Sequence, residues 1–381
     1  MTRRVFALGI IGLLLTELAN VYFIMPMPGS QQMRSIDAAY AVYRWRWALR
    51  VLFGLMVVAG LPAMWRLNGW RRAAAAASMI GLAGVTYAVN FRMSADHMFR
   101  QPTVLNMQPP AHNKVALNRL VVGFALNGDA RAYPLQFIGY HHQVVDSVAG
   151  RRVLVSYCTV CRTGRVFSPI IGGETESFRL VGMDHFNAML EDRTTGSWWR
   201  QANGEAITGS RKGTQLPELP MVQVTLRQWL ALYPNSLIMQ GDPAFGDEYA
   251  KDYAYERGFS HKTLTGTDTA SWKDKSWVVG LTVNGASKAY DWNRLLREGV
   301  VNDVVGGAPV VVLLGPDSLS YFAFRRPSEA TQFSVRGDSL VGDGHTYALS
   351  GQGTSGNLQP LNASQEFWHS WRTFQPATAR Y

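Results

Sequence analysis

Three long apolar segments open the chain and restrict its fold more than any other feature. They run over residues 5–25, 45–65 and 73–91. Each reaches the roughly 20 residues that a helix needs to cross the core of a bilayer. The first segment follows an arginine pair, as in a signal peptide, but it is long and lacks a small-x-small cleavage site. We therefore predict three uncleaved transmembrane helices and a membrane domain over residues 1–91.

Positive charge is concentrated around these apolar segments. Residues 1–72 contain nine arginines against Glu17 and Asp37, which leaves only +3 of the net charge of +10 for the rest of the chain. Such charge indicates membrane topology, and the sequence has no basic stripe with interleaved aromatic residues, so we predict no nucleic-acid binding. The density of arginines places the amino terminus in the cytoplasm. The region after Phe91 is then on the periplasmic side of the inner membrane.

Two polar residues lie within the first apolar segment. Glu17 and Asn20 are at membrane depth, where polar side chains commonly contact other helices. They suggest that the three helices bind other membrane protein subunits as well as the bilayer. The alternative is that Glu17 pairs within the bundle.

The region after the helices contains one pattern twice, at residues 121–133 and 278–290. Each copy has an apolar strand, an Asn-Gly hairpin turn, a second strand that ends in Ala-Tyr, a short helix, a further hairpin and a buried strand. We therefore predict a mainly β (α+β) extracytoplasmic region of two tandem related units. The predicted parts are a connection at 92–114, a first unit at 115–245, a linker at 246–276 and a degenerate second copy at 277–381.

The two cysteines of the chain form one C-x-x-C motif, which only the first copy contains. The positions of the second copy that match Cys158, Cys161, His141 and His142 hold Gly315, Ser318, Glu298 and Gly299. Residues shared by both copies are explained by folding, whereas these donors need another explanation. We therefore predict a functional site in the first unit.

The residue types of this site favour a metal ion. Cys158 and Cys161 lie in a C-x-x-C-x-x-G turn, which can direct both sulfur atoms at one ion. The predicted nitrogen ligands are His141, His142 and His185. Thiolate and imidazole ligands suit copper or zinc, and a nearby thioether from Met183 would favour Cu(I). Further predicted pocket residues are Arg162, Trp199, Gln201 and Glu205.

Two other states of the cysteines stay open at this point. They could form a strained, reducible disulfide or act as a redox-active dithiol. The segment after Cys161 is predicted as turn and strand, so it lacks the helix N-terminus that lowers the pKa of a thioredoxin-type thiol. The sequence identifies no catalytic residue and favours a protein that is not an enzyme.

Several motifs together resemble the DUF3179 family over roughly residues 115–245. They are Asn127-Gly128, Arg131-Ala132-Tyr133-Pro134, His141, Asp146, the stretch 157–164, Trp199-Arg200-Gln201 and Gly204-Glu205-Ala206. The chain departs from the family pattern at Thr159, where proline is usual, and at His142 and His185, where an acidic residue and asparagine are common. The resemblance implies no established activity.

These observations lead to one expected function and two alternatives. We expect a membrane-anchored periplasmic protein whose Cys/His site binds copper or zinc, in metal or thiol handling for a membrane complex. The first alternative is a non-catalytic accessory subunit of a respiratory or photosynthetic membrane complex. The second is a C-x-x-C thiol oxidoreductase.

Overall fold

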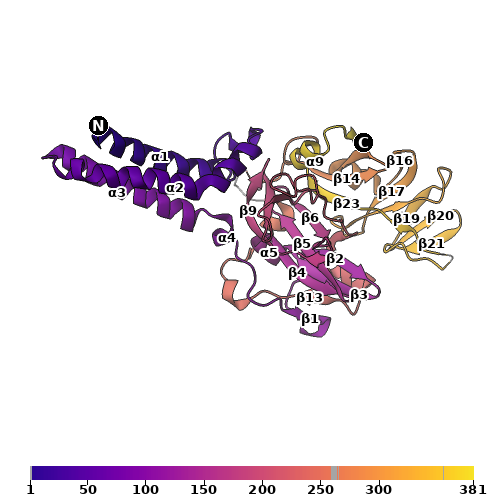
Figure 1. The fold of residues 1–381 in the computed structure, drawn as a ribbon. Coiled ribbons are helices and arrows are strands. Elements are labelled where there is room, and N and C mark those ends of the chain that lie inside the picture. The colour runs from indigo at the N-terminus through magenta and orange to yellow at the C-terminus, as the bar shows by residue number, and fades with distance from the viewer. Residues whose placement is uncertain (1, 259–263, 265, 355) are drawn as a thin grey trace. The chain divides into compact units, whose positions relative to one another are not determined.

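A computed structural model describes residues 2–258, 264, 266–354 and 356–381. The chain divides into two compact units, which we describe one at a time (Figure 1). Unit 1 comprises Met1–Arg100, Phe178–Trp199 and Ala206–Thr214, and unit 2 comprises Gln101–Ser177, Arg200–Glu205 and Gln215–Tyr381. The domain boundaries drawn from the sequence stay predictions.

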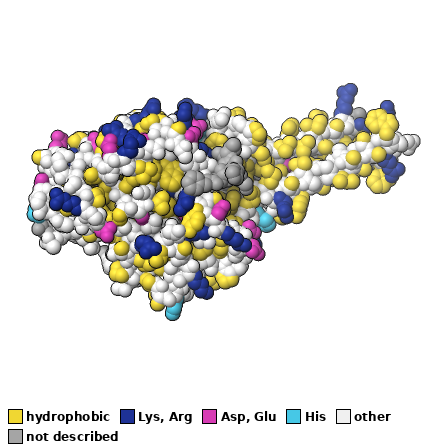
Figure 2. All heavy atoms as spheres, turned by 180° about the vertical axis from the view of Figure 1, so that it is seen from behind, with side chains coloured by type: hydrophobic (Ala, Val, Ile, Leu, Met, Phe, Trp, Pro, Cys, Tyr) yellow, Lys and Arg dark blue, Asp and Glu magenta, His cyan; other side chains and the backbone are white. Residues whose placement is uncertain are grey.

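Unit 1 begins with the three long apolar helices that the sequence predicts. They are α1 (Thr2–Tyr22), α2 (Ile36–Trp65) and α3 (Trp70–Tyr87), the last continued by the π-helical segment η2 (Ala88–Arg92). All three spans are long and apolar enough to cross a membrane. Large apolar side chains on these helices are exposed, and Figure 2 shows hydrophobic side chains gathered over them. These features indicate a membrane protein with three candidate spans.

Helix α2 begins at Ile36, well before the apolar segment that starts near Trp45. The reason is an aromatic contact within unit 1. The rings of Tyr40 and Tyr43 lie 5.0 Å and 5.1 Å from the ring of Trp198. Aromatic packing of this kind adds to the free energy of burial. It therefore stabilises the first helical turns of α2, which hydropathy does not predict.

A buried ion pair joins the helices of unit 1. Arg50 of α2 donates to both carboxylate oxygens of Glu17 of α1, at 2.6 Å and 2.8 Å. The side-chain amide of Asn90 in η2 donates to Glu17 at 2.9 Å and accepts from Arg50 at 2.7 Å. Glu17 therefore pairs within the bundle, which was the alternative left open by the sequence.

Substitution of Arg50 by glutamine is expected to destabilise the helical bundle. Arg50→Gln removes the cation that balances Glu17, whose side chain is only 2% exposed. Breaking a buried ion pair on one side costs about 3–5 kcal/mol. Denaturation of the protein from mild detergent into SDS measures this loss. The control Arg44→Gln replaces an exposed arginine of the same helix, and equal stability of the two variants would contradict the expectation.

A β-hairpin packs with the helices of unit 1. Its strands β9 (Phe178–Asp184) and β10 (Asn187–Asp192) are antiparallel, and the short β11 (Trp198–Arg200) follows beside β10. One buried apolar cluster contains Val21 and Ala39 from the helices together with Val181, Met189 and Trp198. Unit 1 therefore holds a small sheet as well as the membrane helices.

Unit 2 is mainly β and contains two sheets of the same strand order. The first runs β12-β2-β3-β13 with β1 added at its edge, and the second runs β23-β14-β15-β24. In both, the first two pairings are antiparallel and the last is parallel. Their strands are β1 (Met107–Gln108), β2 (Leu120–Leu126), β3 (Asp129–Pro134), β12 (Val222–Thr225), β13 (Leu237–Met239), β14 (Trp277–Val283), β15 (Ala286–Asp291), β23 (Ala363–Phe367) and β24 (Ala379–Arg380).

Each of these sheets is accompanied by a smaller antiparallel sheet and two short helices. The smaller sheets are β4-β5-β6 and β16-β17-β18-β22. Their strands are β4 (Gln143–Val148), β5 (Arg151–Cys158), β6 (Thr163–Phe167), β16 (Val300–Val305), β17 (Ala308–Leu314), β18 (Tyr321–Arg325) and β22 (Gln359–Pro360). The helices are α5 (Leu135–His141) and α6 (Leu226–Leu232) in the first half, and α8 (Trp292–Glu298) and α9 (Trp368–Phe374) in the second.

Side-chain contacts also recur in the two halves. In each half a tyrosine hydroxyl donates to an aspartate of the strand that follows the next short helix, from Tyr133 to Asp146 at 2.8 Å and from Tyr290 to Asp303 at 2.9 Å. A tryptophan ring lies directly on a strand glycine in each half. A Cβ atom on Gly123 would be 2.3 Å from Trp229, and one on Gly280 would be 2.1 Å from Trp371. These shared contacts support the predicted duplication.

The remaining elements are short. The second half has an extra three-stranded sheet, β19 (Phe333–Arg336), β20 (Ser339–Gly342) and β21 (His345–Ala348). The others are the strands β7 (Ile170–Ile171) and β8 (Glu174–Thr175), the helices α4 (Ala95–Met98) and α7 (Ala254–Arg257), and the 3-10 turns η1 (Ser30–Gln32), η3 (Pro110–His112) and η4 (Pro243–Phe245).

Candidate functional site

The cysteine motif forms the turn between β5 and β6. Cys158 is the last residue of β5 and pairs with Thr163, the first residue of β6. Arg162 takes a left-handed backbone conformation with φ of 58°, which closes the turn and brings Cys161 back towards Cys158. Both cysteines are fully buried and present as thiols.

Hydrogen bonds connect the thiols to each other and to α9. Cys161 bonds to the Cys158 side chain and to the Ser370 hydroxyl. Burial raises the pKa of the Cys161 thiol well above its ordinary value, and Cys158 raises it further. Burial therefore favours the protonated form of Cys161 at neutral pH in the absence of a cation.

The C-terminal half of unit 2 supplies the polar surroundings of Cys161. The backbone N–H of Phe367 donates to the Cys161 carbonyl at 2.9 Å. Ser370 donates to the buried carboxylate of Glu366 at 2.5 Å, and Glu366 also pairs with Arg165 of β6 at 3.0 Å. The turn of the first half is thus held by a strand and a helix of the second half.

Two further basic residues lie against the backbone between the cysteines. The Nζ atom of Lys275 donates to the Val160 carbonyl at 2.8 Å, and Nε2 of His369 lies 3.2 Å from the same oxygen. Burial lowers the pKa of Lys275 to about 8, although the charges of the cysteines oppose this shift. Burial and the charge of Lys275 lower the pKa of His369 to about 4.

Sequence reasoning did not identify Lys275, Glu366, His369 and Ser370. A signal was available in the repeat. At the offset that places Trp371 opposite Trp229, Glu366 stands opposite Val224, and Ser370 stands opposite Gln228. At the first of these positions only the second half has a polar residue, and such a residue indicates a site as clearly as a donor confined to the first half does.

Arg162 is buried and directed away from solvent. Its Nε atom donates to the Glu256 carbonyl at 2.7 Å, and the guanidinium lies 3.6 Å from the centre of the Trp277 ring. Burial lowers the pKa of Arg162 to about 10. These contacts make Arg162 part of the support of the cysteine turn.

The predicted histidine ligands have partners outside the cysteine motif. Nε2 of His141 lies 2.8 Å from the Tyr249 hydroxyl, and Nδ1 of His142 lies 3.1 Å from the Tyr140 carbonyl. The backbone of His142 is beside the cysteine strand, because its carbonyl accepts from the Tyr157 N–H at 2.9 Å. Burial lowers the pKa of His142 to about 4. The roles of both histidines as ligands stay predictions.

His185 and Met183 belong to unit 1, whereas the cysteines belong to unit 2. His185 is at the turn between β9 and β10, and its Nδ1 atom lies 2.7 Å from an Asp184 carboxylate oxygen. The backbone N–H of Met183 donates to the Ile24 carbonyl at 2.7 Å. Their predicted roles in a metal site also stay predictions.

The other predicted pocket residues divide between the two units. Trp199 is buried in unit 1, where its Nε1 atom donates to Asp192 at 2.8 Å. Gln201 is buried in unit 2 and donates to Ser156 at 3.2 Å and to the Thr163 carbonyl at 3.0 Å. Gln201 therefore braces the two strands that carry the cysteine turn.

Glu205 lies nearer the surface of unit 2, where it pairs with Arg200 at 3.0 Å.

Across residues 2–258, 264, 266–354 and 356–381, no three His, Cys, Asp or Glu side chains are grouped so that they could hold a metal ion. Among the predicted ligands, the sulfur atoms of Cys158 and Cys161 are therefore the pair that one turn brings together.

Comparison with known proteins gives one match. A family model described as "Protein of unknown function (DUF3179)" matches residues 102–378. No curated protein and no solved structure matches the chain. The match includes both halves of unit 2, beyond the residues 115–245 on which the sequence resemblance was based.

Proposed function

The chain belongs to the DUF3179 family, whose description assigns no activity, and we propose from the chemistry of its site that Cys158 and Cys161 bind one thiophilic metal ion. In this proposal the protein is anchored in the inner membrane with unit 2 on the periplasmic side. It handles copper or zinc for a neighbouring membrane complex.

The observation that carries this proposal is the buried pair of hydrogen-bonded thiols. Two thiolates alone are costly to bury because each would lack a compensating charge. A soft cation replaces both protons and supplies the missing positive charge, so the site gains more from a metal ion than an exposed pair would.

The charges around the pair favour copper(I) over zinc. Two thiolates and one Cu(I) carry one net negative charge, and the ammonium group of Lys275, attracted by both cysteines, can balance it. Copper(I) accepts two sulfur ligands in a linear arrangement, whereas zinc in a closed site takes four ligands. A zinc site would need the predicted imidazole ligands in addition.

Anaerobic titration of the full chain in mild detergent tests the proposal. Wild-type protein is expected to withdraw one equivalent of Cu(I) from its coloured bicinchoninate complex. Cys158→Ser/Cys161→Ser is expected to withdraw none, because it lacks both sulfur ligands. His141→Asn and His142→Asn are matched controls that are expected to retain the copper.

The outcomes of the titration distinguish the possible ligand sets and functions of the cysteine site. Loss of binding in a histidine control would favour a mixed thiolate and imidazole site. Absence of both copper binding and zinc binding by the reduced wild type would remove the proposal. A quantitative Cys158–Cys161 disulfide in its place would favour the thiol oxidoreductase, although burial of both sulfur atoms restricts attack on a protein disulfide.

An accessory structural role is the remaining candidate. Three apolar helices support membrane insertion, but Glu17 is satisfied by Arg50 and Asn90 within the bundle and therefore does not require a partner helix. Stable co-purification of the Cys158→Ser/Cys161→Ser variant with a membrane complex would favour this role over metal handling.

A further inference from the structure

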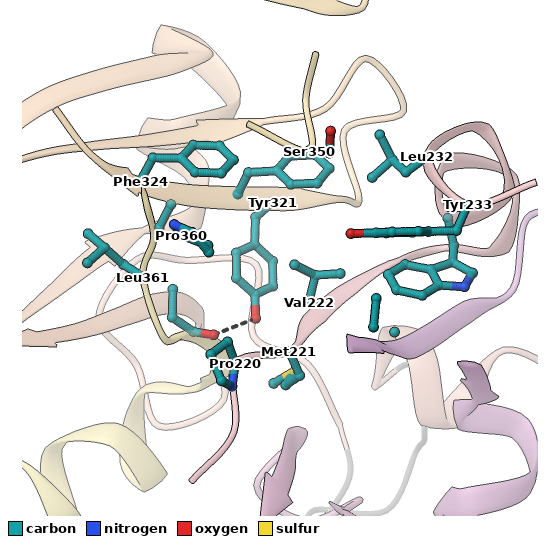
Figure 3. A pocket seen from close by; sticks show the side chains of 16 residues that line it. Pro220, Met221, Val222, Leu232, Tyr233, Tyr321, Phe324, Ser350, Pro360 and Leu361 are labelled. Carbon is teal, nitrogen blue, oxygen red and sulfur yellow. Dashed lines mark hydrogen bonds between the residues drawn. The ribbon is translucent and has the colours of Figure 1, made fainter. Parts of the chain in front are cut away.

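A second site is present in unit 2, formed by both halves of its β structure. An open cavity of about 140 Å³ is lined by β2, the start of β12 and α6 from the first half and by β18, β22 and β23 from the second (Figure 3). None of the 16 residues that line it carries a charge. An apolar cavity of roughly 150 Å³ is large enough to hold one benzene ring.

Aromatic rings form much of the wall. Trp229 lies on Gly123 at the base of the cavity, and the ring of Tyr233 is 4.4 Å from that of Trp229. The ring of Tyr321 stands opposite them (Figure 3). Its hydroxyl is occupied, because it donates to the Ala363 carbonyl at 3.0 Å and accepts from the Gln365 N–H at 3.1 Å. Tyr321 therefore presents its ring to the cavity.

Tyr233 differs from Tyr321 in its hydroxyl. Figure 3 shows the hydroxyl of Tyr233 directed towards Tyr321, across the cavity. Within the part of the chain that the structure describes, this hydroxyl has no hydrogen-bond partner from the protein. Tyr233, Leu232 and Ser350 are only partly buried, so they mark the entrance, whereas Trp229 and Tyr321 are buried at the base.

We propose that this cavity binds a neutral molecule with a single aromatic ring and an oxygen substituent that accepts a hydrogen bond from Tyr233. The volume sets the size of the ring, and the flat aromatic walls favour a planar ligand over a puckered one. The uncharged lining excludes anions and cations, because a charge buried there would have no partner. A hydrogen bond with the Tyr233 hydroxyl at the entrance fixes the orientation of the ligand.

Fluorine NMR of 4-fluorophenol with the full chain in mild detergent tests this site. We expect saturable binding to the wild type that phenol displaces and that cyclohexanol and benzoate do not. Tyr233→Phe is expected to weaken 4-fluorophenol about 3- to 10-fold, the effect of one lost hydrogen bond. The same variant should leave the binding of fluorobenzene, which has no hydroxyl, unchanged.

Filling the cavity separates binding to the protein from partition into the detergent. Ala125→Phe places a ring in the cavity from β2 and is expected to abolish saturable binding, and Leu232→Trp does the same from the entrance if the first variant fails to fold. Binding that persists in a folded filling variant overturns the proposal. Equal displacement by benzoate or cyclohexanol, or an unchanged affinity in Tyr233→Phe, also overturns it.

Discussion

Acidification of the metal-free protein from pH 7 to pH 4 is expected to remove about 6 kcal/mol of stability through two buried histidines. His142 and His369 each have a pKa lowered to about 4, mainly by burial. The unfolded chain protonates a histidine near its ordinary value of about 6.5. Each imidazole therefore contributes about 3 kcal/mol to this loss.

The sign of the effect follows from proton binding. Between pH 6.5 and 4 the unfolded state carries protons on these two side chains that the folded state does not. Stability is therefore complete above about pH 6.5 and declines as the pH falls towards 4. Burial raises the pKa of Glu218 and of Glu256, and these two shifts increase stability as the pH falls. Histidine variants are therefore needed to isolate the contribution of the two imidazoles.

Urea unfolding at pH 7 and pH 4, in detergent with a chelator, measures the difference. His142→Asn and His369→Gln should each reduce the loss on acidification by about half of the histidine effect. Asparagine suits position 142, where φ is 61°. His345→Asn, at an exposed histidine of β21, is the matched control. Identical pH dependence in all four proteins would show that the two buried histidines do not titrate as expected.

The local structure of this chain could be predicted from its sequence to a large extent. Apolar length identifies the three helices, and the Asn-Gly turns at 127–128 and 284–285 locate two hairpins that the structure contains. These patterns are local, and neighbouring residues determine them. The cysteine turn is predictable for the same reason.

The surroundings of the cysteines could not be predicted in this way. Ser370 and His369 approach the motif from a helix more than two hundred residues later in the chain. Such contacts depend on how the two halves of unit 2 pack, and no local pattern encodes that packing. The hairpin of β9 and β10 shows the same limit, because Val181 shares a buried apolar cluster with Val21 of α1, and this packing places the hairpin with the helices of unit 1.

Substitution of Glu366 by glutamine is expected to have the largest effect of any conservative change near the cysteines. Glu366 is 1% exposed and accepts hydrogen bonds from Ser364 at 2.8 Å and from Ser370 at 2.5 Å. It also pairs with the buried Arg165 at 3.0 Å. Glu366→Gln removes this charge and leaves Arg165 with Glu218, whose carboxylate is 3.6 Å away and partly exposed.

The expected loss is about 3–5 kcal/mol, because a buried guanidinium then lacks its closest counter-charge. Urea unfolding followed by tryptophan fluorescence measures it. Glu298→Gln is the matched control, since Glu298 forms an exposed pair with Arg294, and its loss should stay below about 1 kcal/mol. Glu366 also accepts a hydrogen bond from Ser370, the serine that bonds to Cys161. Alkylation of the thiols should therefore become faster in Glu366→Gln. A variant as stable as the control would show that the two halves of unit 2 are held together by apolar packing instead of this ion pair.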